Sequence, residues 1–192
     1  MNAATALNIP VKDILKYTDS VNVCFSKGLS APVGSVIAGT DEFIYNARRL
    51  RRALGGGIRQ GGMLAAAALY ALDNVVPRLR VDHELATSLS KGIMEHHSNL
   101  VSIDINGVHT NIVFITMLRD DITAYKLHDR LLQVTDEERR SIGEAVVVKT
   151  FAYNEKLLRI VLHCDISSDD VDLAIKKFQF VLQEFADQTN SL

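Results

Sequence analysis

The segment from Asp19 to Ser35 reads DSVNVCFSKGLSAPVGS, and it places a single lysine, Lys27, at the end of an apolar stretch. From Val21 to Phe25, apolar residues alternate with polar or small ones, a period of two that is typical of a β-strand. Gly28 and the Ser-Ala-Pro run at residues 30–32 then indicate a turn. We therefore predict a strand that ends in a turn, with Lys27 at the junction.

Lys27 has two interpretations at this point. If the flanking apolar residues desolvate its ammonium group, its pKa falls, and the neutral amine can attack an aldehyde to form a Schiff base. The Ser26 hydroxyl is then placed to hydrogen-bond an anionic group, and Gly28 lets a cofactor ring approach the backbone closely. The alternative is a solvated lysine in a strand-to-turn connection. The spacing alone does not decide between them.

The segments that follow predict alternating strands and helices. Residues 33–39 favour a second strand, and Thr40 is placed to cap an amphipathic helix that the three glycines at 55–57 end. An alanine-rich helix that runs to about Asn74 is expected to be buried. Pro77 begins a long helix with an i, i+4 apolar stripe, which we expect to link two domains.

Beyond this helix the pattern changes to hairpin chemistry. Alternation from Val101 to Ile105, the turn signal Asn106-Gly107 and a return strand at 112–117 predict a β-hairpin with a two-residue turn. The remaining predicted elements are a helix near 124–134, strands at 146–151 and 157–163, and a last amphipathic helix capped by Ser167 and Asp170. This half of the chain is predicted to be α+β, with helices on a small antiparallel sheet.

The composition indicates an ordinary globular protein of 192 residues, with 47% hydrophobic and 23% charged residues. A formal net charge of −2 provides no overall field that would attract nucleic acid or an anionic membrane. Two cysteines far apart and each inside an apolar run, Cys24 and Cys164, favour buried free thiols in a reducing compartment. The longest uncharged apolar stretch, 63–72, is about half of the roughly 20 residues that span a bilayer. With no signal peptide visible, we expect a cytoplasmic protein that contacts neither membrane nor nucleic acid.

Five segments, taken in chain order, carry a family resemblance. They are the lysine segment 19–35, the segment 48–62 with Gly-Gly-Gly-Ile-Arg-Gln at 55–60, and the segments 78–83, 110–114 and 158–167. Together they resemble the threonine aldolases, enzymes of the aspartate-aminotransferase-like fold that use pyridoxal 5'-phosphate (PLP). The resemblance implies the α/β fold class, as the C-terminal part of a PLP-dependent transferase-like fold. Residues 1–75 would be the remnant of the large domain, 76–98 the interdomain helix and 99–192 a small C-terminal α+β domain with an antiparallel sheet.

The same resemblance implies a lyase that cleaves L-threonine or L-allo-threonine to glycine and acetaldehyde. Lys27 matches the catalytic Schiff-base lysine, with Ser26 beside it. Arg159 matches the arginine that holds the substrate's α-carboxylate, a role that suits a planar guanidinium with parallel donors. Arg52 and Arg59 match basic residues near the cofactor phosphate. Because subunits of the family share sites, we expect a homo-oligomer, a dimer or tetramer, that takes a small amino-acid substrate.

Each of these assignments has a structural alternative. Arg159 can instead pair with an acid such as Asp165, the three glycines can simply be a helix C-cap, and residues 48–52 can be a solvated helix face. The histidines show no convincing metal-ligand spacing, since only His163 and Asp165 share a strand face, so we predict no metal site.

Three functional hypotheses remain open. Family members place a Met-Asp-Gly-Ala-Arg-like stretch just before the segment that reads Asn-Ala-Ala-Thr-Ala at 2–6, and its aspartate pairs with the PLP ring nitrogen. Since the chain starts after that stretch, the alternative to an active aldolase is a truncated, catalytically inactive member. Such a member would act as an oligomerisation or interaction module, for example with a full-length paralogue. A β-eliminating lyase or transaminase using the same lysine is the third hypothesis.

Overall fold

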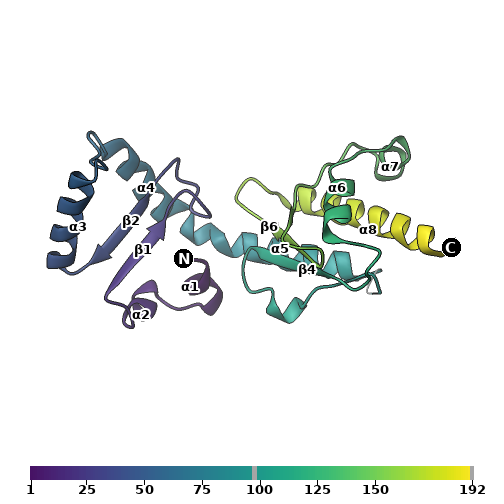
Figure 1. Cartoon of the computed structure of the whole chain (residues 1–192), viewed down its shortest axis with the longest axis horizontal. Coiled ribbons are helices and arrows are strands. Elements are labelled where there is room, and N and C mark those ends of the chain that lie inside the picture. The colour runs from purple at the N-terminus through teal and green to yellow at the C-terminus, as the bar shows by residue number, and fades with distance from the viewer. Residues whose placement is uncertain (97–98, 191–192) are drawn as a thin grey trace. The chain divides into compact units, whose positions relative to one another are not determined.

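The computed structural model describes residues 1–96 and 99–190, with side chains up to residue 188. The described chain forms two compact units, Met1–Arg80 and Val81–Leu192 (Figure 1). Each unit has its own cluster of buried apolar residues and its own sheet.

The first unit is built around a short antiparallel strand pair. Its elements are α1 (Asn2–Leu7), α2 (Val11–Leu15), β1 (Ser20–Cys24), β2 (Ser35–Gly39), α3 (Asp41–Ala53), α4 (Gly62–Asn74), the 3-10 turn η1 (Val76–Arg78) and the start of α5 (Leu79–Met94). β1 and β2 pair from Ser20 opposite Gly39 to Cys24 opposite Ser35, as the adjacent arrows of Figure 1 show. The second strand thus begins two residues later than predicted, because Gly34 has a φ of 110°, a left-handed conformation that ends extended pairing.

The two helices that follow β2 differ from expectation in their burial. The Thr40 cap of α3 is confirmed, since its hydroxyl accepts a hydrogen bond from the Phe43 amide at 3.2 Å. Yet none of the thirteen residues of α3 is buried, and the apolar side chains of Leu50 in the helix and of Leu54 at its C-cap face solvent. The prediction that α4 is buried is also wrong, because the helix reaches the core of this unit along one face only, through Ala71 and its neighbours.

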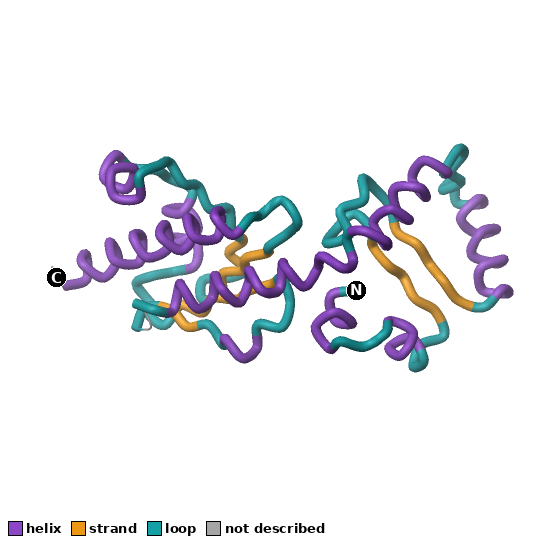
Figure 2. Tube along the Cα trace, turned by 180° about the vertical axis from the view of Figure 1, so that it is seen from behind, coloured by secondary structure: helices purple, strands orange, loops and turns teal. Residues whose placement is uncertain are grey.

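The second unit is an α+β sandwich, which confirms the predicted class of this half. Its elements are the rest of α5, β3 (Val101–Ser102), the 3-10 turn η2 (Ile105–Gly107), β4 (Ile112–Met117), α6 (Ala124–Leu131), α7 (Asp136–Ile142), β5 (Phe151–Ala152), β6 (Leu157–Val161) and α8 (Ser168–Asn190). In the described residues the strands form an antiparallel sheet in the order β3-β4-β6-β5. Figure 2 shows these short strands joined by long loops.

Two predictions for this unit, one of a turn and one of a strand, are wrong. The predicted two-residue turn at Asn106-Gly107 is wrong. Gly107 lies in η2, and its amide donates to the Asp104 carbonyl at 2.9 Å. The strand predicted at 146–151 is reduced to Phe151–Ala152. Its earlier part bonds elsewhere: the Val148 amide donates to the carbonyl of Leu131 at the end of α6, at 3.1 Å.

One face of this sheet carries the main core. Val113 and Ile115 of β4 and Leu158 of β6 are fully buried, and the side chains between them point away from the core. The helices α5, α6 and α8 supply the rest of this core, with residues such as Ala86, Leu127 and Phe178.

Helices α5 and α8 approach one another closely at Gly92. A Cβ atom placed on Gly92 would lie 2.5–2.8 Å from three side-chain carbons of Ile175, closer than side chains tolerate. Gln179 reinforces the contact by donating from Nε2 to the Gly92 carbonyl at 3.1 Å. Glycine at this position is therefore required by packing.

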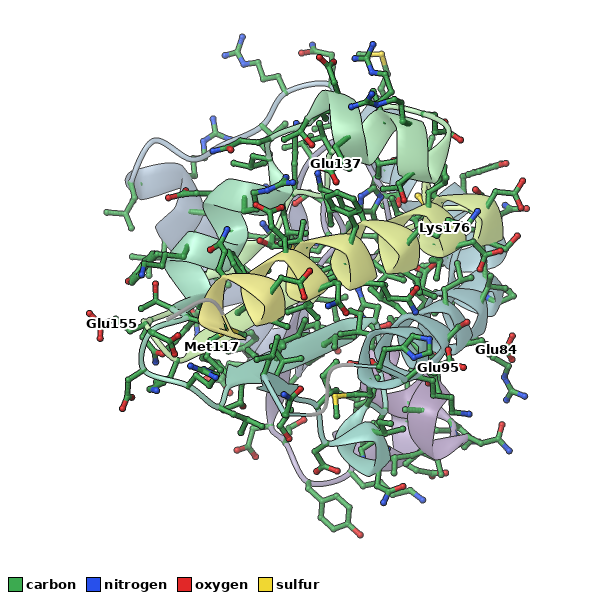
Figure 3. The ribbon with its side chains drawn as sticks, turned by 90° about the vertical axis from the view of Figure 1, so that its right-hand side faces the viewer. Glu84, Glu95, Met117, Glu137, Glu155 and Lys176 are labelled. Atoms are coloured by element: carbon green, nitrogen blue, oxygen red, sulfur yellow. The ribbon has the colours of Figure 1, made fainter. Side chains whose placement is uncertain are left out.

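A buried cluster of charges ties α6, α7 and α8 together. The guanidinium of Arg130 donates to Glu138 at 3.0 Å and lies 2.8 Å from the carboxylate of Glu184. Lys177 donates to the other oxygen of Glu138 and to the carbonyl of Gln133. Figure 3 shows Lys176, one residue earlier, on the outer side of α8, so adjacent lysines have opposite environments.

Candidate functional site

Lys27 lies on a loop whose backbone is held at several points. The Phe25 amide donates to the Gly34 carbonyl at 3.0 Å, the Ala31 amide to the Phe25 carbonyl at 2.9 Å, and the Ser30 amide to the Lys27 carbonyl at 2.8 Å. Phe25, Ala31 and Leu29 of the same loop are buried. The loop is thus anchored on both sides of the lysine.

The Lys27 side chain itself is exposed and borders a cavity of about 340 Å³. The other lining residues come from α1, α2, β1 and the start of α5, and include Val21, Val23 and Leu29. Of the two interpretations left open for Lys27, desolvation by its apolar neighbours is wrong, because Phe25 and Leu29 turn into the core and leave the Lys27 side chain in solvent. Among the described residues no hydrogen bond or ion pair engages this ammonium.

Cys24 lines the same cavity, and Ser26 is paired with it. The Cys24 sulfur lies 3.3 Å from the Ser26 hydroxyl. The hydrogen bonds from the side chain and backbone of Ser26 lower the pKa of the Cys24 thiol, with a smaller effect from the positive charge of Lys27. The Ser26 hydroxyl, predicted to face the cofactor, thus has a partner within its own strand end.

The basic residues proposed near a phosphate, Arg52 and Arg59, are both exposed and do not line the Lys27 cavity. The glycines between them form a helix C-cap, the alternative named from the sequence. The Gly55 amide donates to the Arg52 carbonyl at 3.1 Å and the Gly56 amide to the Arg51 carbonyl at 2.8 Å. These two amides are therefore already used within the helix cap.

Arg159 belongs to the second unit, at the centre of β6, on the sheet face opposite the core. No hydrogen bond or ion pair engages it within the described residues. Asp165, the acid proposed as its structural partner, instead lies beside His163, with 3.5 Å between Oδ2 and Nδ1. The guanidinium is thus available to an external anion.

In the described part of the chain, no three histidine, cysteine or acidic side chains gather closely enough to hold a metal ion. Within the same residues, no helix combines the length and hydropathy that a bilayer span requires.

Comparison with known proteins identifies the class. An L-threonine aldolase of low specificity from Arabidopsis thaliana is 39% identical over 179 residues, 93% of this chain and 46% of that protein. The low-specificity L-threonine aldolase of Escherichia coli K12 is 33% identical over 171 residues, 88% of this chain and 45% of that protein. The chain thus spans about half the length of the curated relatives it matches.

Solved structures define the fold. A crystal structure from Listeria monocytogenes, provisionally assigned as an L-allo-threonine aldolase, superposes with a TM-score of 0.70 at 17% identity, over 91% of this chain and 48% of that chain. An 8-amino-7-oxononanoate synthase from Francisella tularensis superposes with a TM-score of 0.56 at 19% identity, over 95% of this chain and 50% of that chain. The chain has part of the aspartate-aminotransferase-like fold, an α/β architecture of PLP-dependent enzymes.

Within that class the family is settled by sequence. The model of the beta-eliminating lyase family matches residues 1–119, and the chain belongs to this family. Threonine aldolases and beta-eliminating lyases of this fold depend on PLP. The resemblance to threonine aldolases predicted from the sequence is confirmed.

Several residues of interest were not found by sequence reasoning. Cys24 was interpreted only as a buried thiol, yet it is exposed beside Lys27. The available signal was its position in the run that ends at Lys27, where Cys24 alternates with the apolar Val23 and Phe25 and so lies on the opposite strand face from them. Phe114 and Phe151, which face Arg159 across the sheet, had no signal, because strand register is not visible in one sequence.

Proposed function

We propose that the chain carries the lysine-bearing and carboxylate-binding parts of a PLP-dependent threonine aldolase-like lyase. The reaction is cleavage of L-threonine or L-allo-threonine to glycine and acetaldehyde. The observation that carries the proposal is the exposed, unpaired Lys27 on an anchored loop beside a cavity. In this proposal residues 1–75 belong to the PLP-binding domain, 76–98 to an interdomain helix and 99–192 to the small domain.

The residues of the first unit suit PLP chemically. The primary amine of Lys27 is accessible to an aldehyde, and the exposed guanidinium groups of Arg52 and Arg59 are suited to a phosphate. When bound, PLP supplies an electron sink for cleavage of the bond between Cα and Cβ. After that cleavage, the Lys27 amine is the group of this chain suited to hold or return a proton.

Arg159 has a separate task in the proposal. Its guanidinium offers two parallel N–H donors to the α-carboxylate of the amino acid, which fixes the orientation of the Cα bonds. The support is its position on the outward sheet face and the absence of a competing acid among the described residues. A lysine would offer a point charge there without the bidentate geometry.

Covalent capture of PLP tests the role of Lys27 directly. The chain is incubated with PLP and reduced with sodium borohydride, which fixes PLP to the amine it has condensed with, and the labelled peptide is identified by mass spectrometry. We expect the label on Lys27 and its loss in Lys27→Ala. Lys12→Ala, an exposed lysine of α2, is the matched control and should retain the label.

Two outcomes would contradict the proposal. Labelling spread evenly over exposed lysines, or unchanged in Lys27→Ala, would remove Lys27 as the cofactor lysine. Acetaldehyde release from L-threonine and L-allo-threonine then measures turnover. Release of 2-oxobutyrate and ammonia from L-threonine instead would assign the chain to elimination chemistry, and formation of pyruvate from L-alanine in the presence of a 2-oxo acid acceptor would assign it to transamination.

A second candidate function is that of a catalytically inactive family member acting as an oligomerisation or interaction module. The exposed apolar side chains of Leu50 in α3 and of Leu54 at its C-cap favour it. Sedimentation analysis of the chain, and of Leu50→Gln/Leu54→Gln, tests it. Self-association that the double variant abolishes, without PLP capture at Lys27, would support the module. Self-association together with PLP capture at Lys27 would support the lyase, which we propose to be a cytoplasmic homo-oligomer.

A further inference from the structure

Arg159 stands in the middle of a row of three residues that crosses three neighbouring strands. The register of the sheet places Phe114 of β4 opposite Arg159 on one side and Phe151 of β5 opposite it on the other. Directly opposite residues of antiparallel strands share a face, with Cβ atoms about 4.5–5.5 Å apart. The arginine is therefore flanked on both sides by a phenylalanine.

Both phenylalanines face away from the core of this unit. Their side chains are 46% and 57% exposed, whereas Val113 and Ile115, on either side of Phe114 in the chain, are fully buried. The ring of Phe151 meets that of Tyr153 edge-on, with 6.4 Å between the centroids. Exposed rings gathered around one charged residue are typical of a binding surface.

The charge between these rings has no anion of its own. Within residues 1–96 and 99–188, neither a hydrogen bond nor an ion pair engages Arg159, and Asp165 lies beside His163. A guanidinium offers no acceptor atoms, so an external group that binds between the rings has to supply them. A carboxylate matches this requirement with two acceptor oxygens in one plane.

We propose that Phe114 and Phe151 are positioning residues that wall the Arg159 guanidinium and so hold the α-carboxylate of an amino acid. The inference rests on the proposed function of Arg159. In this proposal the rings shield both sides of the guanidinium from water and leave it open outward from the sheet. Because less water and salt reach the pair, the charge-assisted hydrogen bonds to a carboxylate are stronger than those of an open surface arginine.

The test follows carboxylate binding without requiring PLP. Acetate and L-threonine are titrated into the full chain, and the side-chain Nε–H signal of Arg159 is observed by NMR. Phe114→Thr and Phe151→Thr keep the propensity for strands but open the wall. We expect each to weaken binding roughly three- to tenfold, because water and salt then reach the ion pair between Arg159 and the carboxylate.

The salt dependence of acetate binding separates shielding by the two phenylalanines from a merely structural role, which would leave that dependence unchanged. In the threonine variants the affinity for acetate should fall more steeply with added NaCl than in the wild type, because an open ion pair is screened more. Phe114→Leu and Phe151→Leu retain an apolar wall and should stay close to wild type. Tyr125→Thr, which removes an exposed aromatic residue of α6, is the control for general surface effects.

Arg159→Gln separates this inference from the proposed function. If Arg159→Gln abolishes binding while the threonine variants bind as wild type does, the walling role is refuted and the carboxylate role stands. If Arg159→Gln leaves binding unchanged, both are refuted. If the threonine variants fail to fold, the salt dependence of the wild type tests the inference instead. If the wild type loses affinity for acetate with salt as steeply as an open ion pair does, the inference is overturned.

Discussion

The ammonium of Lys177 on α8 donates to the carboxylate of Glu138 on α7, and neither side chain has any exposed surface. Burial of Lys177 lowers the pKa of its ammonium, while its bond to Glu138 opposes that shift. Arg130 donates to the second oxygen of the same carboxylate. The buried carboxylate of Glu138 therefore pairs with two cations from two different helices, and Glu184 is a second partner of Arg130.

Removing that anion should strongly destabilise the chain. In Glu138→Ala, Lys177 and Arg130 remain in a buried site with much less negative charge, so we expect a loss of about 3–5 kcal/mol in the free energy of unfolding. Urea denaturation measures it. Glu137→Ala is the matched control, because the neighbouring Glu137 is exposed and should change stability little.

The lysine can also be removed together with the acid. We expect Glu138→Leu/Lys177→Met to recover part of the loss, because an apolar pair leaves no lysine charge without its partner. Lys176→Met, at the adjacent exposed position, serves as the control. A double variant as unstable as Glu138→Ala would show that Arg130 and Glu184 dominate the cluster.

Gly92→Ala should test the contact between α5 and α8. Alanine normally favours a helix over glycine by about 1 kcal/mol, but here its Cβ would overlap Ile175. We expect a net loss of about 1–3 kcal/mol in denaturant unfolding, the usual range for overpacking. In the background of Ile175→Ala the same substitution should be neutral or stabilising. Additive effects in this double-mutant cycle would contradict the contact.

The cap of α8 should make stability depend on pH. The Ser167 hydroxyl and amide donate to Asp170 at 2.6 and 2.8 Å, and they lower the pKa of that carboxyl. A lowered pKa in the folded state contributes stability that is complete above the ordinary value of about 3.8 and is lost as the pH falls through the lower value.

Asp170→Asn should therefore lower the thermal midpoint at pH 6, and its difference from the wild type should shrink when the pH falls below about 3.8. Asp169→Asn removes a charge from the same helical turn and has no such bond to Ser167, so it isolates the effect of the helix dipole. Equal pH profiles for the two variants would refute the cap as the cause.

Cys24 should react faster with alkylating reagents than Cys164. Its thiol is exposed, and the Ser26 hydrogen bonds lower its pKa, so more thiolate is present near neutral pH. Iodoacetamide labelling followed by mass spectrometry measures both rates in one sample. Ser26→Ala should slow the labelling of Cys24 and leave that of Cys164 unchanged; equal slowing of both would point to a general structural change.

Much of the fold was predictable because helix caps and helix ends depend on residues that are close together in the sequence. The Thr40 cap, the end of α3 at the glycines and the Ser167 cap need only a few neighbouring positions. The predicted strand at 146–151 failed for the opposite reason. Val148 has a suitable β-branched side chain, but its amide bonds to Leu131, a partner that no local pattern reveals.

The candidate site was predictable to a different degree. Lys27 and Arg159 were found because the resemblance extends along the chain, and their structural roles remain a proposal. The sequence could not decide whether Lys27 is desolvated or solvated, since alternation in a strand shows which residues share a face but not which face is covered. Phe114 and Phe151 could not be found, because their relation to Arg159 depends on strands that pair at long range.

The hydrogen bonds from Phe25 and Ser30 across the Lys27 loop also bear on the speed of cofactor capture. With the backbone already in place, the amine reaches an aldehyde by rotating about the bonds of its own side chain. Such rotations of an exposed residue take picoseconds to nanoseconds, far less than the ordering of a loop. Capture of PLP should therefore be limited by encounter and by the bond-forming chemistry, and its rate should rise in proportion to PLP concentration.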